Sequence, residues 1–150
     1  MRTVELLLDD DLEAAVRAAW ARLAPLGVGS LAGHPHPTNR PHVTLAAGSS
    51  SLPAGLPALP LPVTLDGTLM LGRVLAWRVV PTPELLALHE QVWRRMDDPN
   101  PLHAPGAWVP HVSLARKAPP GFAFAAGTRS GSFVAARSYD SGTRTVREIG

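Results

Sequence analysis

Apolar runs of strand length alternate along the chain with two stretches that have helical periodicity. The first run, residues 3–8 (TVELLL), is apolar and partly β-branched, which predicts a strand. After the aspartates at 9–11, which are suitable N-caps, apolar residues recur at the spacing of one helix face, and Pro25 with Gly27 ends this pattern. The apolar positions of this first predicted helix are Leu12, Val16, Ala19 and Leu23.

The rest of the chain follows a similar order. A second predicted helix begins with Thr82 as its cap and Pro83 in its first turn. Its apolar face consists of Leu85, Leu88, Val92 and Met96. Further strands are expected at 42–47, 63–71, 74–80, 111–115, 122–126, 132–139 and 143–149. The long connections, all rich in Pro or Gly, are expected at 32–41, 48–62 and 99–110.

Two short segments of the chain are nearly the same. Residues 40–46 read RPHVTLA and residues 109–115 read VPHVSLA, so that six of the seven positions are identical or exchange Thr for Ser. The two histidines, at positions 42 and 111, are 69 residues apart, which is close to half of the 150-residue chain. Each segment follows a helix and a Pro-rich loop that contains histidine. This pattern indicates an internal duplication.

Composition narrows the class of protein. A chain of 150 residues with 45% hydrophobic residues fits one globular domain. The absence of cysteine excludes disulfides and thiolate chemistry, and the net charge of +2 does not by itself indicate nucleic-acid binding. No apolar run is long enough to span a bilayer, and the N-terminus does not resemble a signal peptide, so we expect a cytoplasmic protein. The C-terminal part is basic and could face an anion or solvent, through Arg129, Arg137, Arg144 and Arg147.

The repeated segments carry the residues with the clearest chemistry. Because alternate side chains of a strand share a face, His42 and Thr44 point one way, and so do His111 and Ser113. The apolar residues between them, Val43, Leu45, Val112 and Leu114, are expected to point into the core. If the two halves are related by a pseudo-twofold axis, two imidazoles and two hydroxyls meet in one cleft.

Such a cleft suits a phosphodiester. One neutral imidazole can take a proton from an attacking water or 2′-hydroxyl, and the other, protonated, can give one to the leaving oxygen. The hydroxyls of Thr44 and Ser113 can donate hydrogen bonds to non-bridging phosphate oxygens. This arrangement requires no metal and no other cofactor. The sequence leaves open which histidine is the acid and which is the base.

The paired His-x-Thr and His-x-Ser segments resemble the tandem motifs of the 2H phosphoesterase superfamily. The greatest similarity is to its short bacterial members, the LigT-like 2′-5′ RNA ligases and the RNA 2′,3′-cyclic phosphodiesterases. The resemblance implies an α+β fold with two lobes related by a pseudo-twofold axis, in which two antiparallel sheets surround a central cleft and helices lie outside. It also implies a single domain over 1–150, with two internal repeats and intertwined lobes.

The same resemblance implies the site and the activity. It places the catalytic pair on His42 and His111 and the phosphate-binding hydroxyls on Thr44 and Ser113. The implied reaction hydrolyses, or reversibly ligates, RNA-type phosphodiesters such as 2′,3′-cyclic phosphates or 2′-5′ linkages. The connection at 48–62 is shorter than in the longer members of this family, and no basic, aromatic-rich surface is evident. Both features favour a small nucleotide or an RNA terminal phosphate as the partner. No protein partner is expected, and the chain is expected to be a monomer.

Four residues near the motifs are candidate substrate contacts. Arg40 could face the phosphate, and Arg116 and Lys117 could guide an anion to the cleft, although exposed basic residues in these positions need no function. Trp108, three residues before His111, could stack on a base. Other aromatic residues that could do so are Trp77, Phe122 and Tyr139, whereas Trp20 and Trp93 lie on predicted helices and are expected in the core.

Two other functions remain open from the sequence. The chain could be a noncatalytic module that binds a nucleotide or RNA on the same fold, although paired proton carriers would then have no purpose. It could also be a metal hydrolase that combines His34, His36 and His103 of the two loops with His42 or His111. No nearby Asp, Glu or Cys completes a ligand set, so the sequence predicts no metal site.

Overall fold

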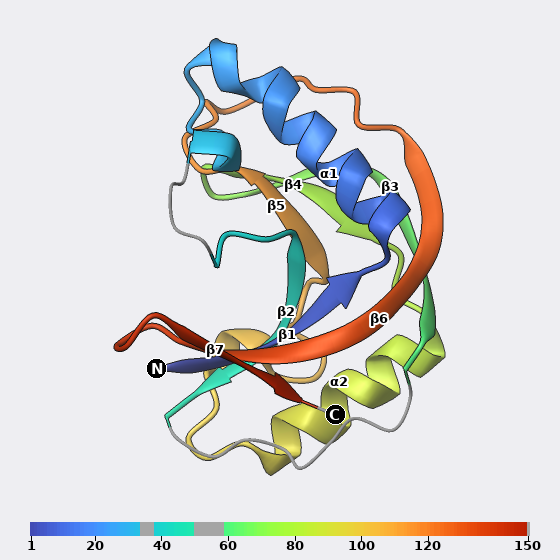
Figure 1. Ribbon diagram of the computed structural model, residues 1–150, viewed down its shortest axis with the longest axis vertical. Helices are drawn as coiled ribbons and strands as arrows, with labels where there is room; N and C mark the ends of the chain where they lie inside the picture. Colours follow the sequence, from blue (N-terminus) through green and yellow to red (C-terminus); the bar gives the residue numbers. More distant parts are fainter. Residues whose placement is uncertain (34–37, 50–58, 150) are drawn as a thin grey trace.

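The computed structural model describes residues 1–33, 38–49 and 59–149. They form an α+β fold in which one antiparallel sheet is covered by two helices (Figure 1). The strands are β1 (Arg2–Leu8), β2 (His42–Gly48), β3 (Leu61–Leu71), β4 (Val74–Val79), β5 (His111–Ala115), β6 (Thr128–Asp140) and β7 (Thr145–Ile149). The helices are α1 (Asp10–Leu23) and α2 (Pro83–Arg95), with short 3₁₀ helices at Ala24–Leu26, Leu31–Gly33 and Pro101–His103.

The sheet is continuous through the long strand β6. Its order is β2-β1-β6-β3-β4-β5, and β7 pairs with β6 outside this path. Residues 133–140 of β6 pair with β1, whereas residues 128–133 pair with β3. The predicted α+β class is therefore confirmed, and the two sheets expected from the sequence are the two halves of one sheet, because a single strand pairs with a different neighbour at each end.

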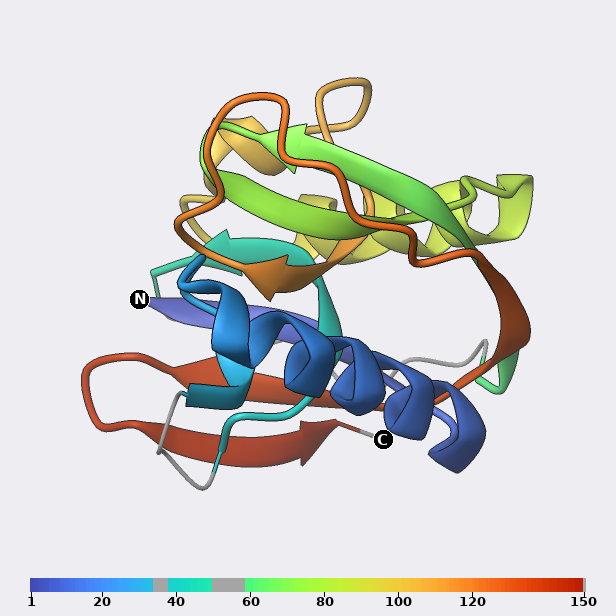
Figure 2. The same ribbon diagram turned by 90° about the horizontal axis from the view of Figure 1, so that it is seen from above.

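Both helices begin where their capping residues predict. The Asp9 carboxylate accepts the Leu12 N–H at 2.8 Å at the start of α1, and the Thr82 hydroxyl accepts the Leu85 N–H at 3.1 Å at the start of α2. Helix α1 ends at Leu23, before a 3₁₀ turn that closes at a left-handed glycine. Helix α1 packs against β5 and β6, and α2 packs against β2, so that both helices lie outside the sheet (Figures 1 and 2).

The core lies between the sheet and these helices. The apolar positions predicted for both helices are buried, and the four residues between the polar positions of the motifs, Val43, Leu45, Val112 and Leu114, are also buried. Trp20 is buried as expected, and Trp93 is half-buried against the core. Neither helix in the described ranges has the length and apolar character that a bilayer crossing requires.

The strand expected at 122–126 is the clearest error of the sequence prediction. These residues have no regular secondary structure, and their aromatic side chains pack against the core instead of extending the sheet. The Arg22 guanidinium lies 4.6 Å from the Phe124 ring centre and donates to the Ala125 carbonyl at 3.3 Å. The segment is thus held by side-chain contacts with α1, which hydrophobic pattern alone does not distinguish from strand pairing.

Three strand boundaries also differ from the predicted ones by two residues or more. Strand β6 begins at Thr128 instead of 132, and β3 begins at Leu61 instead of 63, because the two pair with each other from these residues onward. Strand β7 begins at Thr145 instead of 143, because the N–H groups of Gly142 and Thr143 donate to the Asp140 carboxylate in a turn.

Gly131 of β6 is expected to be important for stability, because a Cβ atom there would collide with the Asp9 carboxylate and the Leu12 side chain. Asp9 caps α1 and also accepts the Ser132 N–H at 2.7 Å, so it has little freedom to move. We predict that Gly131→Ala lowers the free energy of unfolding, measured in urea, by about 1–3 kcal/mol. As a control, Gly33→Ala should change it by no more than about 0.5 kcal/mol, because nothing lies within 4 Å of the added atom. Equal stabilities of the two variants would contradict this close approach.

Candidate active site

The two motifs lie on the terminal strands of the sheet order, and these strands meet. Strand β2 is at one end of that order and β5 is at the other, yet β2 contacts β5 because the sheet curves around (Figure 1). His42 begins β2 and His111 begins β5. The structure thus brings the two histidines that the sequence singles out to neighbouring strands, and a positive charge on His42 lowers the pKa of His111.

Both imidazole rings are held in the same way. His42 Nδ1 lies 2.7 Å from the Arg40 carbonyl oxygen, and His111 Nδ1 lies 2.7 Å from the Val109 carbonyl oxygen. Because a carbonyl oxygen can only accept, each Nδ1 carries a hydrogen and donates it. In the neutral ring Nε2 is then the acceptor, so Nε2 is the atom of each histidine that can exchange a proton with a ligand.

Burial makes His111 easier to keep neutral. Loss of hydration lowers the pKa of His111 below its usual value, and this is the largest effect. The hydrogen bond to the Val109 carbonyl acts in the opposite direction, and the nearby charge of His42 lowers the pKa further. Both rings remain half-exposed, so they are accessible to a ligand.

The main chain of the hydroxyl-bearing residue in each motif is held by an indole. The Trp20 Nε1–H of α1 donates to the Ser113 carbonyl at 3.0 Å, and the Trp108 Nε1–H donates to the Thr44 carbonyl at 2.9 Å. Each hydroxyl-bearing residue therefore has its main chain tied to a large, buried ring. A fixed main chain limits the positions that the Thr44 and Ser113 hydroxyls can reach.

A cleft of about 310 Å³ opens beside the first motif. Its lining includes His42, Thr44, Glu5, Arg116, Arg137 and Tyr139. Arg116, which follows the second motif, also lines this cleft, whereas His111 and Ser113 of that motif do not. The cleft thus combines an imidazole, a hydroxyl and a guanidinium, which are groups that bind phosphate.

A buried ion pair forms the floor of this cleft. Arg137 Nε donates to Glu5 Oε1 at 2.8 Å, and both side chains are almost fully buried. The other oxygen, Glu5 Oε2, accepts the Thr3 hydroxyl at 2.8 Å and lies 3.6 Å from His42 Nε2. Arg137 also donates to the Thr38 carbonyl at 2.9 Å. Sequence reasoning missed Glu5, although a single carboxylate within the otherwise apolar run at 3–8 is a usable signal.

The four candidate substrate contacts have different positions. Arg116 lines the cleft. The Arg40 guanidinium pairs with Glu13 of α1, and it is the Arg40 carbonyl that faces His42. The stem of Lys117 packs close to Gly29, and Lys117 is not among the residues that line the cleft. Trp108 lies outside this cleft, and its ring stacks on His89 with centroids 4.0 Å apart.

The remaining aromatic and histidine candidates lie in different parts of the structure. Tyr139 lines the cleft, whereas Trp77 is buried with its indole donating to the Gly127 carbonyl, and Phe122 packs against the core. His103 Nδ1 is buried and has no hydrogen-bond partner. The described residues contain no group of three His, Asp or Glu side chains that could hold a metal, and the candidates His34 and His36 lie outside the described residues.

Comparison with known proteins identifies solved structures that share this fold. No protein-family model matches the sequence, and no curated protein matches it either. Among solved structures, the chain superposes on LigT of E. coli in its apo form with a TM-score of 0.63 and 19% identity, covering 99% of this chain and 94% of LigT. The chain has the LigT fold. LigT of E. coli complexed with 3′-AMP gives a TM-score of 0.59 and 16% identity, covering 99% and 92%. The similarity to LigT predicted from the motifs is thus confirmed for the fold.

The Glu5–Arg137 pair is expected to contribute strongly to stability. Removing one partner leaves the other as an uncompensated buried charge, so we predict that Arg137→Met lowers the free energy of unfolding by about 3–5 kcal/mol. Arg94→Met is the matched control, because Arg94 pairs with Glu90 on the exposed face of α2 and such a pair contributes less than about 1 kcal/mol. Chemical denaturation of the two variants measures the difference. A loss in Arg137→Met no larger than that of the control would contradict the role of the pair.

Proposed function

We propose that the chain is a metal-independent phosphodiesterase of the 2H type that uses His42 and His111 as its proton carriers. Its substrates are RNA-type phosphodiesters, namely 2′,3′-cyclic phosphates or 2′-5′ linkages. The observation that carries the proposal is the matched orientation of the two rings, in which each Nδ1 donates to the carbonyl two residues earlier. Each Nε2 is thereby reserved for proton exchange, on two strands that contact each other.

The surroundings of the rings support different roles for them in hydrolysis. His111, whose pKa is lowered by burial, is the neutral base and takes a proton from the attacking water through Nε2. His42 is the acid and gives its Nε2 proton to the leaving ribose oxygen. The Glu5 carboxylate lies 3.6 Å from His42 Nε2, where its negative charge attracts an imidazolium. In the ligation direction the two roles are reversed.

The remaining groups hold the phosphate. The hydroxyls of Thr44 and Ser113 donate to non-bridging oxygens, and the indole bonds to their carbonyls keep the two residues in place. Arg116 adds a positive charge at the cleft that offsets the charge of the phosphate. The 3′-AMP complex of LigT supports a nucleotide or an RNA terminal phosphate as the partner.

Replacing either histidine tests the proposal. We predict that His42→Ala and His111→Ala each lower kcat/KM for a nucleoside 2′,3′-cyclic phosphate by about 100-fold or more, because each removes one proton carrier. The assay contains EDTA, and the wild type is expected to remain active in it. His103→Gln is the control, because this histidine lies outside both motifs and should retain activity within a few-fold.

Three other outcomes would contradict the proposal. Near-normal rates of both alanine variants would exclude the catalytic pair. Tight nucleotide binding by the wild type without turnover would indicate a noncatalytic binding module. Loss of wild-type activity in EDTA would indicate a metal hydrolase.

The pH dependence tests the role of His111 separately. A base must be neutral to accept a proton, so activity is lost as the pH falls through its pKa in the folded protein. Because burial lowers the pKa of His111, the acidic limb of kcat/KM should lie below the usual histidine pKa of about 6.5. A pH–rate profile of the hydrolysis measures the position of this limb. An acidic limb at or above that value would contradict His111 as the base.

A further inference from the structure

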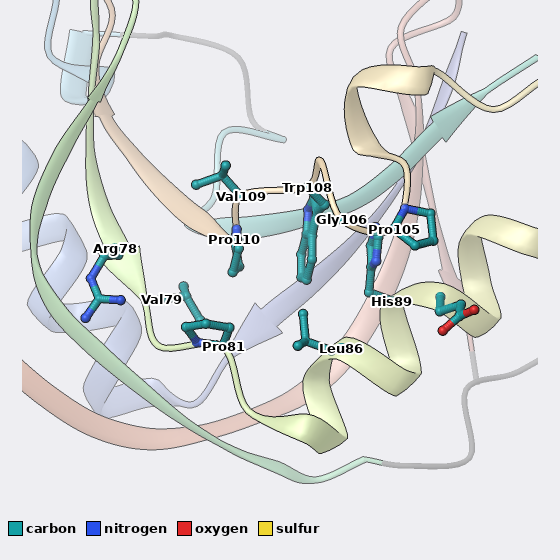
Figure 3. A pocket seen from close by; sticks show the side chains of 11 residues that line it. Arg78, Val79, Pro81, Leu86, His89, Pro105, Gly106, Trp108, Val109 and Pro110 are labelled. Atoms are coloured by element: carbon teal, nitrogen blue, oxygen red, sulfur yellow. The ribbon is translucent and has the colours of Figure 1, made fainter.

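A second, larger pocket lies beside the loop that precedes His111. It has a volume of about 540 Å³ and lies between the N-terminal half of α2, the end of β4 and the loop at 105–110 (Figure 3). Its size is within the range of small-molecule sites. Its walls are largely apolar, and they include Pro81, Leu86, Trp108, Val109 and Pro110. Leu86 and Val109 are unusually exposed for apolar residues, at 45% and 43%.

Two residues that line this pocket are neighbours of His111. The Val109 carbonyl that accepts the His111 Nδ1–H belongs to a residue that also lines the pocket. Arg78 of β4 lies directly opposite His111 in the sheet register and also lines the pocket. Directly opposed residues of an antiparallel pair share a face, so Arg78 and His111 project from the same face. Arg78 therefore borders both His111 and this pocket.

The polar groups of the pocket are few and complementary to a flat heterocycle. In the view of Figure 3, the Trp108 ring stands between His89 on one side and Pro110 on the other. His89 is almost fully buried, stacks parallel to Trp108 and uses Nε2 to donate to the His103 carbonyl at 2.7 Å. Burial lowers the pKa of His89, so the ring is neutral and its Nδ1 is a hydrogen-bond acceptor.

Arg78 and Glu90 complete the polar lining. Arg78 pairs with Asp66 of the neighbouring strand β3 at 3.4 Å, and Glu90 pairs with Arg94 of its own helix at 2.7 Å. Both side chains are exposed enough to meet a ligand at the rim. The pocket thus combines apolar walls with an imidazole, a carboxylate and a guanidinium.

We propose that this pocket binds the nucleobase of the nucleotide whose phosphate lies at the two histidines. The proposal rests on the proposed function and specifies its substrate class as nucleosidic, so that a base-free sugar phosphate is a poor substrate. Bases with an exocyclic amino group fit best, because His89 and Glu90 both accept hydrogen bonds. Arg78, which lies beside His111 in the sheet and also lines the pocket, connects the phosphate end of the ligand to its base end.

The test compares a nucleoside substrate with a base-free one. The substrates are adenosine 2′,3′-cyclic phosphate and 1-O-methylribose 2,3-cyclic phosphate, and the variant is Leu86→Lys, which places a charge on an exposed wall of the pocket. We expect Leu86→Lys to raise KM for the adenosine substrate about 10-fold, since the variant weakens base contacts of the kind that stabilise bound nucleotides. Its kcat should stay within about 2-fold, and its KM for the base-free substrate should not change.

Val134→Lys is the matched control. Val134 of β6 is as exposed as Leu86 and lies outside the pocket, so this variant should behave as the wild type with both substrates. Circular dichroism establishes that both variants are folded. Adenosine alone provides a second measurement, because it should inhibit hydrolysis of the base-free substrate competitively in the wild type and about 10-fold more weakly in Leu86→Lys.

The possible results distinguish failure of the nucleobase site from failure of the proposed phosphodiesterase activity. The nucleobase site is overturned if Leu86→Lys has the same KM as the wild type for both substrates, or if its KM rises equally for both. Either result would leave the phosphodiesterase activity intact. If the wild type hydrolyses neither substrate, the proposed function fails. The pocket is then tested by equilibrium dialysis with adenosine, where binding that Leu86→Lys weakens supports the site and no binding overturns it.

Discussion

The pairing of β6 with both β1 and β3 is the constraint on which the site depends. One strand serves both halves of the sheet, so the halves cannot separate into independent layers. The sheet curves around this strand until its two outermost strands, β2 and β5, contact each other. Two segments that lie 69 residues apart, at positions 42 and 111, become neighbours for this reason, and neither needs to form a direct ladder with the other.

Although the motifs are alike, the strands beside them are not. Opposite Thr44 in the sheet is Glu5, whereas opposite Ser113 is Ala76. The buried carboxylate and its arginine partner therefore occur beside only one of the two motifs. A sequence comparison of the two motifs suggests interchangeable histidines, and the different roles that we propose for them rest on residues of neighbouring strands.

The sequence predicted the parts of the structure that local patterns control. Helix caps at Asp9 and Thr82, the buried faces of both helices and the inward apolar residues of the motifs follow from spacing alone. The segment at 122–126 was misjudged because aromatic residues pack against a core as readily as they form strands. The position of Glu5 beside His42 was not predictable, since it depends on the register between β1 and β2 and on a bulge in that ladder.

The indole hydrogen bonds link the halves of the chain in a crossed manner. Trp20 precedes the first motif in the sequence but holds the main chain of the second, and Trp108 precedes the second motif but holds the main chain of the first. Each half of the polypeptide therefore supplies the indole N–H that holds the motif of the other half. Local opening of either half releases a backbone carbonyl in the other, so the two motifs gain and lose order cooperatively, and a fragment containing one motif alone has no donor for it.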